Sequence, residues 1–191
     1  MAEPVPAALS EVPWSPEEEA ALIQAAQSSP ALFKDLYLHW VTPVYRYFLH
    51  RVGHPEDAED LTSQVFLKVC EELPRYQHRG HFAAWLFTIA RNKCRDYFRR
   101  PPRQVPIEES EGTAPDPDLL AQVVRRDEVK LLEHLIRALP EGELEMMRLR
   151  YVAGLSYAEI GALLDRSEEA ARKAITRLLA RLQRQMGGDH E

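Results

Sequence analysis

The chain has 191 residues and a formal net charge of −6, because 24 lysines and arginines stand against 30 aspartates and glutamates. No apolar run reaches the ~18 residues of a membrane span, and the start lacks the basic and apolar regions of a signal peptide. We therefore expect neither membrane insertion nor secretion. Cys70 and Cys94 are the only cysteines, which fits a reducing cytoplasm with two inert, half-buried thiols.

Helix signals begin early in the chain. Four prolines predict a disordered N-terminus over residues 1–16. Ser15 and Pro16, followed by three glutamates, are typical of a helix start, with a serine cap and acidic residues in the first turn. We expect this first helix to end near Gln27.

Two longer helices should follow. Apolar residues at spacings of three and four predict a helix over residues 31–52, with a kink at Pro43 and an end at Gly53. The next helix should begin at Pro55, with acidic residues in its first turn, and run to about Leu73.

The stretch from residue 75 to residue 103 is strongly basic. It carries eight lysines and arginines against Asp96 alone, a local charge of +7, so the rest of the chain sums to −13. A polar loop around Gly80 should lead into a helix that is apolar first and basic later. Such a basic stripe on an acidic protein suits phosphate binding. A solvated cationic helix end is the alternative.

Residues 101–125 differ from both flanks. Prolines and acidic residues are frequent and aromatic residues are absent, which is typical of a flexible linker. No alternating pattern of a strand occurs anywhere. The sequence therefore predicts an all-α protein with two helical domains, over residues 17–100 and 126–186, and a short tail over residues 187–191.

The second domain should contain four helices, over about 131–139, 143–151, 157–164 and 168–185. Only a short turn separates the last two, which is typical of a helix-turn-helix. Ser156 and Glu159 form a capping-box pattern at the third helix. The fourth helix should bury apolar residues on one side and expose residues suited to base edges or phosphates on the other: Arg172, Lys173, Thr176 and Arg177. A helical hairpin that packs on another protein is the alternative.

Three segments together resemble the extracytoplasmic-function sigma factors, the small specificity subunits of bacterial RNA polymerase. The segments are Val44-Tyr-Arg-Tyr-Phe through Val69, Phe82-Ala-Ala-Trp-Leu-Phe through Arg100, and Leu139-Pro through the last helix. The resemblance implies that the first domain opens the −10 promoter element and the second reads the −35 element. It also implies that the linker threads the polymerase cleft.

The resemblance implies roles for particular residues as well. The −10 surface would comprise a base-trapping loop and a basic helix: Tyr76, Gln77, His78, Arg79, His81, Arg91, Asn92, Arg95, Arg99 and Arg100. For Asn92, a bond to helix backbone in the core is an equal alternative. The −35 surface would add Ser167 to the four exposed residues of the last helix. Asp57, Asp60 and Gln64 would dock on the polymerase clamp helices.

Some positions depart from the family pattern. Ser63-Gln64 replaces the usual Gln-Glu, which affects the expected clamp contact. Asp165-Arg166 replaces glycine and an apolar residue in the turn, where aspartate tolerates left-handed backbone. Ala171 and Lys173-Ala174 also differ from the usual residues, so the −35 sequence that is read should be unusual.

The expected partners are core RNA polymerase, through its clamp helices and flap, and promoter DNA. An anti-sigma factor is a further partner that the family allows. A helix-turn-helix regulator that binds duplex without polymerase is the alternative function. We expect no enzymatic activity and no cofactor. His78 and His81 lack a third ligand at suitable spacing, so a metal site is not expected.

Overall fold

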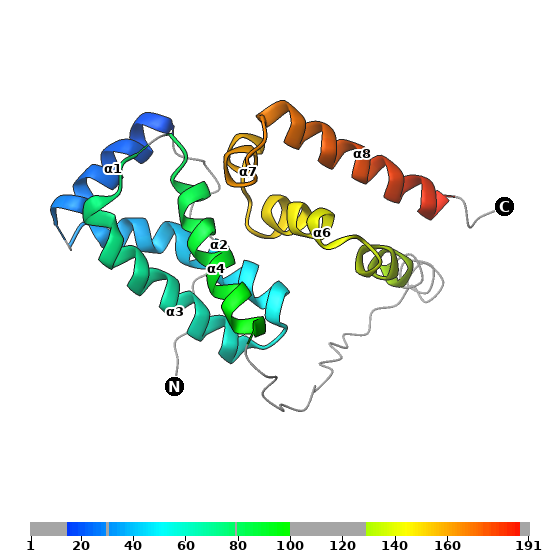
Figure 1. The fold of residues 1–191 in the computed structure, drawn as a ribbon, viewed down its shortest axis with the longest axis horizontal. Coiled ribbons are helices and arrows are strands. Elements are labelled where there is room, and N and C mark those ends of the chain that lie inside the picture. Colours follow the sequence, from blue (N-terminus) through cyan, green and yellow to red (C-terminus); the bar gives the residue numbers. More distant parts are fainter. Residues whose placement is uncertain (1–14, 30, 79, 100–128, 188–191) are drawn as a thin grey trace, which may run out of the picture.

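The computed structural model describes residues 15–29, 31–78, 80–99 and 129–187 (Figure 1). These residues contain helices and turns but no strand, which confirms the all-α prediction for this part of the chain. The predicted linker over residues 101–125 lies outside the described residues, as do residues 1–14, Arg79 and Arg100.

Helix α1 runs over Pro16–Ser28 and begins as the sequence predicts. The Ser15 hydroxyl accepts from the Glu18 backbone N–H at 3.2 Å, and the Glu18 carboxylate accepts from the Ser15 N–H at 2.8 Å. This reciprocal pair satisfies two N–H groups that a helix start leaves without partners.

Helices α2 (Phe33–Val52) and α3 (Pro55–Glu72) form the body of the N-terminal domain with α4 (Phe82–Arg99). Pro43 lies inside α2, and Gly53 ends that helix in left-handed backbone at φ 79°. A short 3-10 turn, η1 (Leu73–Arg75), follows α3. The apolar half of α4 packs inward, as expected, with Phe82, Leu86 and Phe87 fully buried.

The C-terminal domain starts with a helical segment over residues 129–137. It continues with α6 (Glu141–Met147), a π-helical turn η2 (Arg148–Val152), α7 (Tyr157–Leu163) and α8 (Glu168–Gly187). The single helix predicted for residues 143–151 is wrong in detail, because α6 starts two residues earlier and widens into η2. The Ser156–Glu159 capping box is present at the start of α7.

The turn between α7 and α8 depends on close backbone packing. Asp165 adopts left-handed backbone at φ 55°, as the sequence predicts for this position. A Cβ added at Gly161 would lie 2.7 Å from the Arg166 carbonyl oxygen. Only glycine therefore lets α7 approach the turn this closely.

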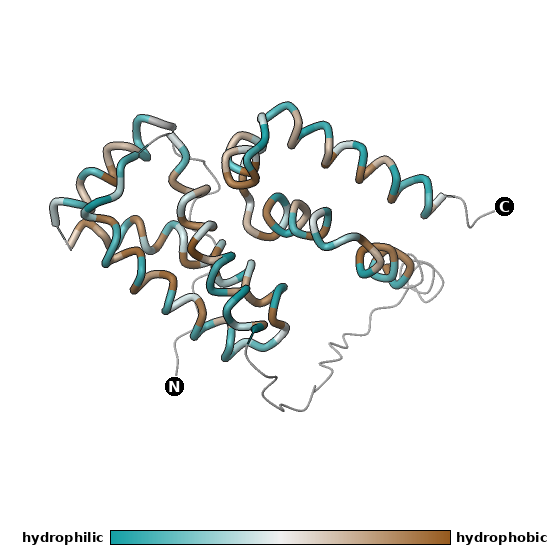
Figure 2. Tube along the Cα trace, viewed as in Figure 1, coloured by the Kyte–Doolittle hydropathy of each residue, from teal (hydrophilic) through white to brown (hydrophobic). Residues whose placement is uncertain are grey.

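The two domains pack against each other. One hydrophobic cluster runs through both and joins Phe87 and Tyr47 of the N-terminal domain to Met146 and Leu149 of the C-terminal domain. Figure 2 shows hydrophobic and hydrophilic segments alternating along the helices, as expected where each helix buries one face. Helix α7 contacts α4, and η2 contacts α2.

Two predictions about burial were wrong. Cys94 is buried and Cys70 is exposed, so neither thiol is half-buried. Burial raises the pKa of the Cys94 thiol. Leu32 and Tyr37 belong to the apolar pattern that predicted the helix over residues 31–52, but both are exposed, whereas Tyr47 is fully buried. Tyr47 continues the helical series of buried residues Leu36, Trp40 and Val44, so periodicity within α2 places it on the buried face.

Candidate nucleic-acid interfaces

The loop before α4 is fixed by hydrogen bonds from α1. The Gln27 side-chain amide donates to the Leu73 carbonyl oxygen at 2.9 Å and to the Tyr76 carbonyl oxygen at 2.6 Å. These bonds span 46 and 49 residues of sequence. Gly80 takes left-handed backbone at φ 86°, which a side chain would disfavour. The loop that leads into α4 is therefore held in a defined conformation by Gln27 and by the left-handed backbone of Gly80.

The predicted base-trapping residues differ in their exposure. The Tyr76 ring is half-buried and lies 4.4 Å from Trp85 and 5.6 Å from Phe82, centroid to centroid. His78 is also half-buried, 6.2 Å from Tyr76, while Gln77 and His81 are exposed. The aromatic residues thus form a cluster of mostly edge-to-face contacts around Tyr76, and Gln77 and His81 are the exposed polar side chains of the loop.

The basic end of α4 lines a cleft between the domains. Arg91, Asn92, Arg95 and Arg99 all face this cleft, whose volume is about 1040 Å³. Asn92 is exposed and accepts from Arg95 at 3.0 Å, so its side chain bonds a neighbouring arginine rather than the helix backbone. The Arg91 Nε lies 3.0 Å from a Glu145 carboxylate oxygen.

Helix α8 presents its basic residues together. The four residues predicted to face DNA are all exposed and line one shallow hollow: Arg172, Lys173, Thr176 and Arg177. On the opposite side of the helix Ala171, Ile175, Leu178 and Leu182 are buried. The Ser167 hydroxyl accepts from the Ala170 N–H at 3.1 Å and thereby caps the helix.

The three residues predicted to dock on polymerase lie along α3. Asp60 and Gln64 are exposed, and Asp57 is half-buried. The Tyr97 hydroxyl of α4 donates to the Asp57 carboxylate at 2.8 Å. Lys93 of α4 approaches Gln64 to 3.5 Å. Asp57 therefore joins α3 to α4 in addition to any external role.

A group of charged residues at the domain contact is absent from the sequence predictions. Glu145 of α6 is 6% exposed and accepts from the Tyr47 hydroxyl at 2.9 Å. Burial and the neighbouring Glu145 carboxylate raise the pKa of Tyr47. Glu141 pairs with Arg51 of α2 and with Arg148. In the sequence, the indication of this group is the position of Glu145, a carboxylate that lies between the apolar residues Leu144 and Met146.

Within the described residues, no group of three histidine, cysteine or acidic side chains is arranged to hold a metal ion. Over the same residues, none of the helices combines the length and apolarity needed to cross a bilayer. The arrangement thus offers two basic surfaces, the α4 end and the exposed face of α8, that suit an anionic polymer.

Comparison with known proteins identifies this arrangement. The Sigma-70 region 2 profile matches residues 36–103, and the Sigma-70 region 4 profile matches residues 130–182. The chain is 31% identical over 175 residues to the ECF RNA polymerase sigma factor ShbA of Streptomyces griseus, covering 85% of this chain and 92% of ShbA. The chain belongs to the extracytoplasmic-function family of RNA polymerase sigma factors.

Two other similar proteins are informative. ECF RNA polymerase sigma factor BldN of Streptomyces coelicolor is 34% identical over 174 residues, which covers 84% of this chain. The match spans 64% of BldN, slightly less than two thirds of that protein's length. The structure of CnrH in complex with the cytosolic domain of CnrY matches with a TM-score of 0.58 and 25% identity, covering 88% of this chain and 97% of CnrH.

Proposed function

We propose that this protein binds core RNA polymerase and directs it to a specific set of promoters. The observation that carries the proposal is the order of two basic surfaces within one sigma-type chain. A basic helix with a positioned loop comes first, and a capped helix-turn-helix comes second. We assign residues 17–100 to the −10 domain, 101–125 to the linker and 126–186 to the −35 domain.

Helix α8 reads the −35 duplex in the major groove. Its buried face fixes the helix on α7, which leaves Arg172, Lys173, Thr176 and Arg177 free of packing. Arginine can bond O6 and N7 of guanine together, and threonine can contact a thymine methyl group. Ser167 stands at the capped start of the helix, where a backbone phosphate would lie.

The loop from Tyr76 to His81 captures a base of the −10 element. Opening a duplex costs ~1.4 kcal/mol per stacked step, so contacts to the freed strand must offset that cost. Gln77 and His81 are exposed enough to bond a base edge. The half-buried Tyr76 packs against Trp85 and so anchors the loop on α4. Arg79 belongs to the same loop. Along the strand, phosphates would meet the basic end of α4, comprising Arg91, Arg95, Arg99 and Arg100.

The polymerase contact lies on α3. Asp60 and Gln64 offer an exposed polar surface, and Asp57 borders it. We assign this surface to the clamp helices, and the −35 domain to the flap. The linker then passes through the polymerase cleft between the two contacts. The protein would act in the cytoplasm and reach the nucleoid through polymerase.

An anti-sigma factor is a further proposed partner. The structurally similar CnrH was solved in complex with the cytosolic domain of CnrY. A partner of this kind would cover the polymerase or DNA surfaces of the present chain.

In vitro transcription tests the proposal. The full-length chain is added to bacterial core polymerase with a genomic promoter pool, and new transcript starts are mapped. Promoter-specific starts that depend on the chain support a sigma function. Tight binding to duplex in the absence of polymerase, with no new start on any promoter, would instead identify a helix-turn-helix regulator.

A further inference from the structure

We infer that helix α1 sets the conformation of the −10 loop, the segment from Tyr76 to His81, because Gln27 and Glu19 hold the two ends of this loop from one face of α1. Both are positioning residues for the choice of base at the −10 element. The inference rests on the proposed function, since that function assigns base capture to the −10 loop. Helix α1 itself precedes the part of the chain that matches Sigma-70 region 2.

Three residues of α1 share one face of the helix at a spacing of four: Glu19, Ile23 and Gln27. Ile23 is 1% exposed and belongs to the hydrophobic core, so it fixes this face of α1 against the rest of the domain. The polar residues one turn before and one turn after Ile23 are thereby directed inward. Buried polar groups need hydrogen-bond partners, and here the partners are backbone groups at the two ends of the −10 loop.

Gln27 holds the start of the loop. Its side-chain amide donates to the Leu73 carbonyl oxygen at 2.9 Å and to the Tyr76 carbonyl oxygen at 2.6 Å. The Leu73 carbonyl oxygen also accepts from the Tyr76 N–H at 3.0 Å, which closes η1. One amide group therefore joins both ends of this turn and fixes the point at which the chain leaves η1. The packing of the Tyr76 ring on Trp85 depends on that point.

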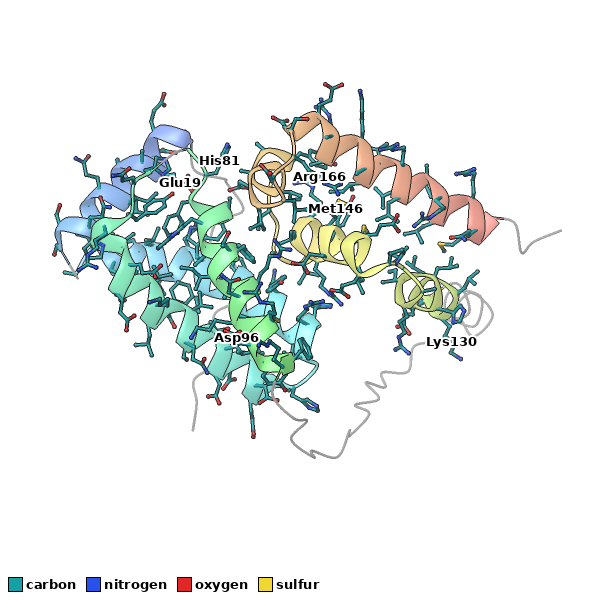
Figure 3. All side chains as sticks on the ribbon, viewed as in Figure 1. Glu19, His81, Asp96, Lys130, Met146 and Arg166 are labelled. Carbon is teal, nitrogen blue, oxygen red and sulfur yellow. The ribbon has the colours of Figure 1, made fainter. Side chains whose placement is uncertain are left out.

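Glu19 holds the end of the loop. Its carboxylate accepts from the N–H of Phe82, the first residue of α4. The first N–H groups of a helix have no partner within the helix, and a carboxylate near them also interacts favourably with the helix dipole. Glu19 is only 8% exposed, so water does not readily replace it. Figure 3 shows Glu19 near His81, where the chain enters α4.

The two anchors enclose the residues that are proposed to bond the captured base. Gln77 and His81 lie between the carbonyl groups held by Gln27 and the N–H held by Glu19. A flipped base is recognised by hydrogen bonds to its edge, and these bonds weaken steeply when their geometry is poor. Both anchors join segments of the N-terminal domain, so neither bond needs a partner in the C-terminal domain.

The test compares variants in pairs. Gln27→Met keeps the length of the side chain and removes its donors, whereas Gln27→Lys restores a donor at similar reach. Glu19→Leu removes the acceptor, whereas Glu19→Gln keeps an acceptor oxygen. Gln24→Met is the matched control, because Gln24 is exposed on the same helix.

The first readout is amide hydrogen exchange in the full-length chain without DNA. Gln27→Met and Glu19→Leu should raise the exchange rate of residues 74–82 several-fold, because each removes a bond that holds the loop. Exchange within the buried part of α3 should stay as in the parent, which excludes a general loss of stability. Gln27→Lys, Glu19→Gln and Gln24→Met should exchange as the parent does. Unchanged exchange of residues 74–82 in Gln27→Met would overturn the inference.

The second readout is base preference at the −10 element. Runoff transcription with core polymerase compares a promoter from the genomic pool with versions that carry single −10 substitutions. Gln27→Met should reduce the preference for the parent −10 base several-fold and leave the preference among −35 substitutions unchanged, and Gln27→Lys should retain most of the −10 preference. An equal loss on every promoter would show that Gln27 contributes stability alone, and would overturn the inference.

The outcomes also separate this inference from the proposed function. Faster exchange of the loop together with a weaker −10 preference supports the inference. Faster exchange with an unchanged −10 preference rejects the positioning role and leaves the sigma function standing. If the parent chain itself gives no promoter-specific start, the proposed function fails, and the role of α1 in base choice fails with it, while the exchange rates still show whether α1 holds the loop.

Discussion

Tyr47 of α2 donates its phenolic hydrogen to Glu145 of α6 at 2.9 Å, although 98 residues of chain separate the two. Both side chains are buried, Tyr47 at 1% and Glu145 at 6% exposure. This bond joins the two domains at the point where their hydrophobic clusters merge. It therefore links the stability of the chain to the packing of the two domains.

Replacement of Tyr47 by phenylalanine should therefore weaken the domain contact. The ring still fills its site, but Glu145 loses a hydrogen-bond donor in a buried setting, which costs about 1–3 kcal/mol. Urea unfolding followed by circular dichroism measures the loss. Tyr37→Phe, on an exposed residue at the start of the same helix, is the control and should change stability by less than ~0.5 kcal/mol. Equal effects of the two changes would contradict a role for the bond.

Arg172 and Arg177 are predicted to read the −35 element. Replacement of either by alanine should weaken promoter use by about 1–3 kcal/mol if the side chain bonds a base, and the loss should be confined to promoters with the preferred base. Runoff transcription on a set of promoters with single −35 substitutions measures this. Gln183→Ala, on an exposed residue further along α8, is the control. An equal loss on every promoter would show that the arginine contacts phosphate.

Gly161 should not tolerate a side chain. The Cβ of an alanine there would lie 2.7 Å from the Arg166 carbonyl oxygen and 3.1 Å from the Glu168 N–H. These are backbone atoms of the turn, so the turn itself must move, at a cost of about 1–3 kcal/mol in unfolding free energy. Promoter use should also fall, because α8 would shift on α7.

Gly142→Ala is the matched control for this change. Gly142 lies in helix α6, and no atom approaches the position of its Cβ within 4 Å. Alanine favours a helix by up to ~1 kcal/mol over glycine, so this variant should be as stable as the parent or slightly more so. Thermal unfolding of both variants decides the matter, and an unaffected Gly161→Ala variant would show that the turn is more adaptable than its backbone contacts indicate.

Glu19 of α1 should make stability depend on pH. Burial raises the pKa of Glu19 to about 7, the carboxylate of Glu159 on α7 adds to the rise, and a bond from the Phe82 N–H opposes it. Figure 3 shows Glu19 beside the start of α4. His39 faces the same Glu159, and burial lowers its pKa, so it supplies little positive charge there.

The sign follows from proton binding. Between pH 4.5 and about 7 the folded chain keeps the Glu19 proton and the unfolded chain has lost it. The contribution of Glu19 is therefore most favourable below pH 4.5 and is lost as pH rises to about 7, on the order of 1–3 kcal/mol. Glu19→Gln should remove this slope and be more stable than the parent at pH 8. Glu17→Gln, exposed on the same helix, should leave the slope intact.

Local signals predicted much of the fold. The capping boxes at Ser15 and Ser156, the left-handed Gly53 and the left-handed Asp165 all lie where the sequence placed them. The exposed face of α8 was also predictable, because helical periodicity alone separates Arg172 and Arg177 from Ile175 and Leu178. These features depend on interactions between residues no more than a few positions apart, so a short segment of sequence is enough to predict each of them.

The candidate −10 surface was predictable in outline but not in detail. The sequence indicated an aromatic, polar loop before a basic helix, yet the packing of Tyr76 on Trp85 depends on how the loop folds back on α4. The support from Gln27 crosses 46 to 49 residues, a separation at which sequence spacing carries no information.

The amino-acid sequence alone determined the all-α class, the capped starts of α1 and α7, the helix-turn-helix and the resemblance to sigma factors, since each follows from periodicity, capping or motif order. Only the tertiary structure decided that the two domains pack together, that Tyr47 and Glu145 are buried as a pair, and that Arg91 faces a carboxylate. The physical reason is that burial and charge pairing depend on which surfaces meet in space, and residues 98 positions apart meet only in the folded chain.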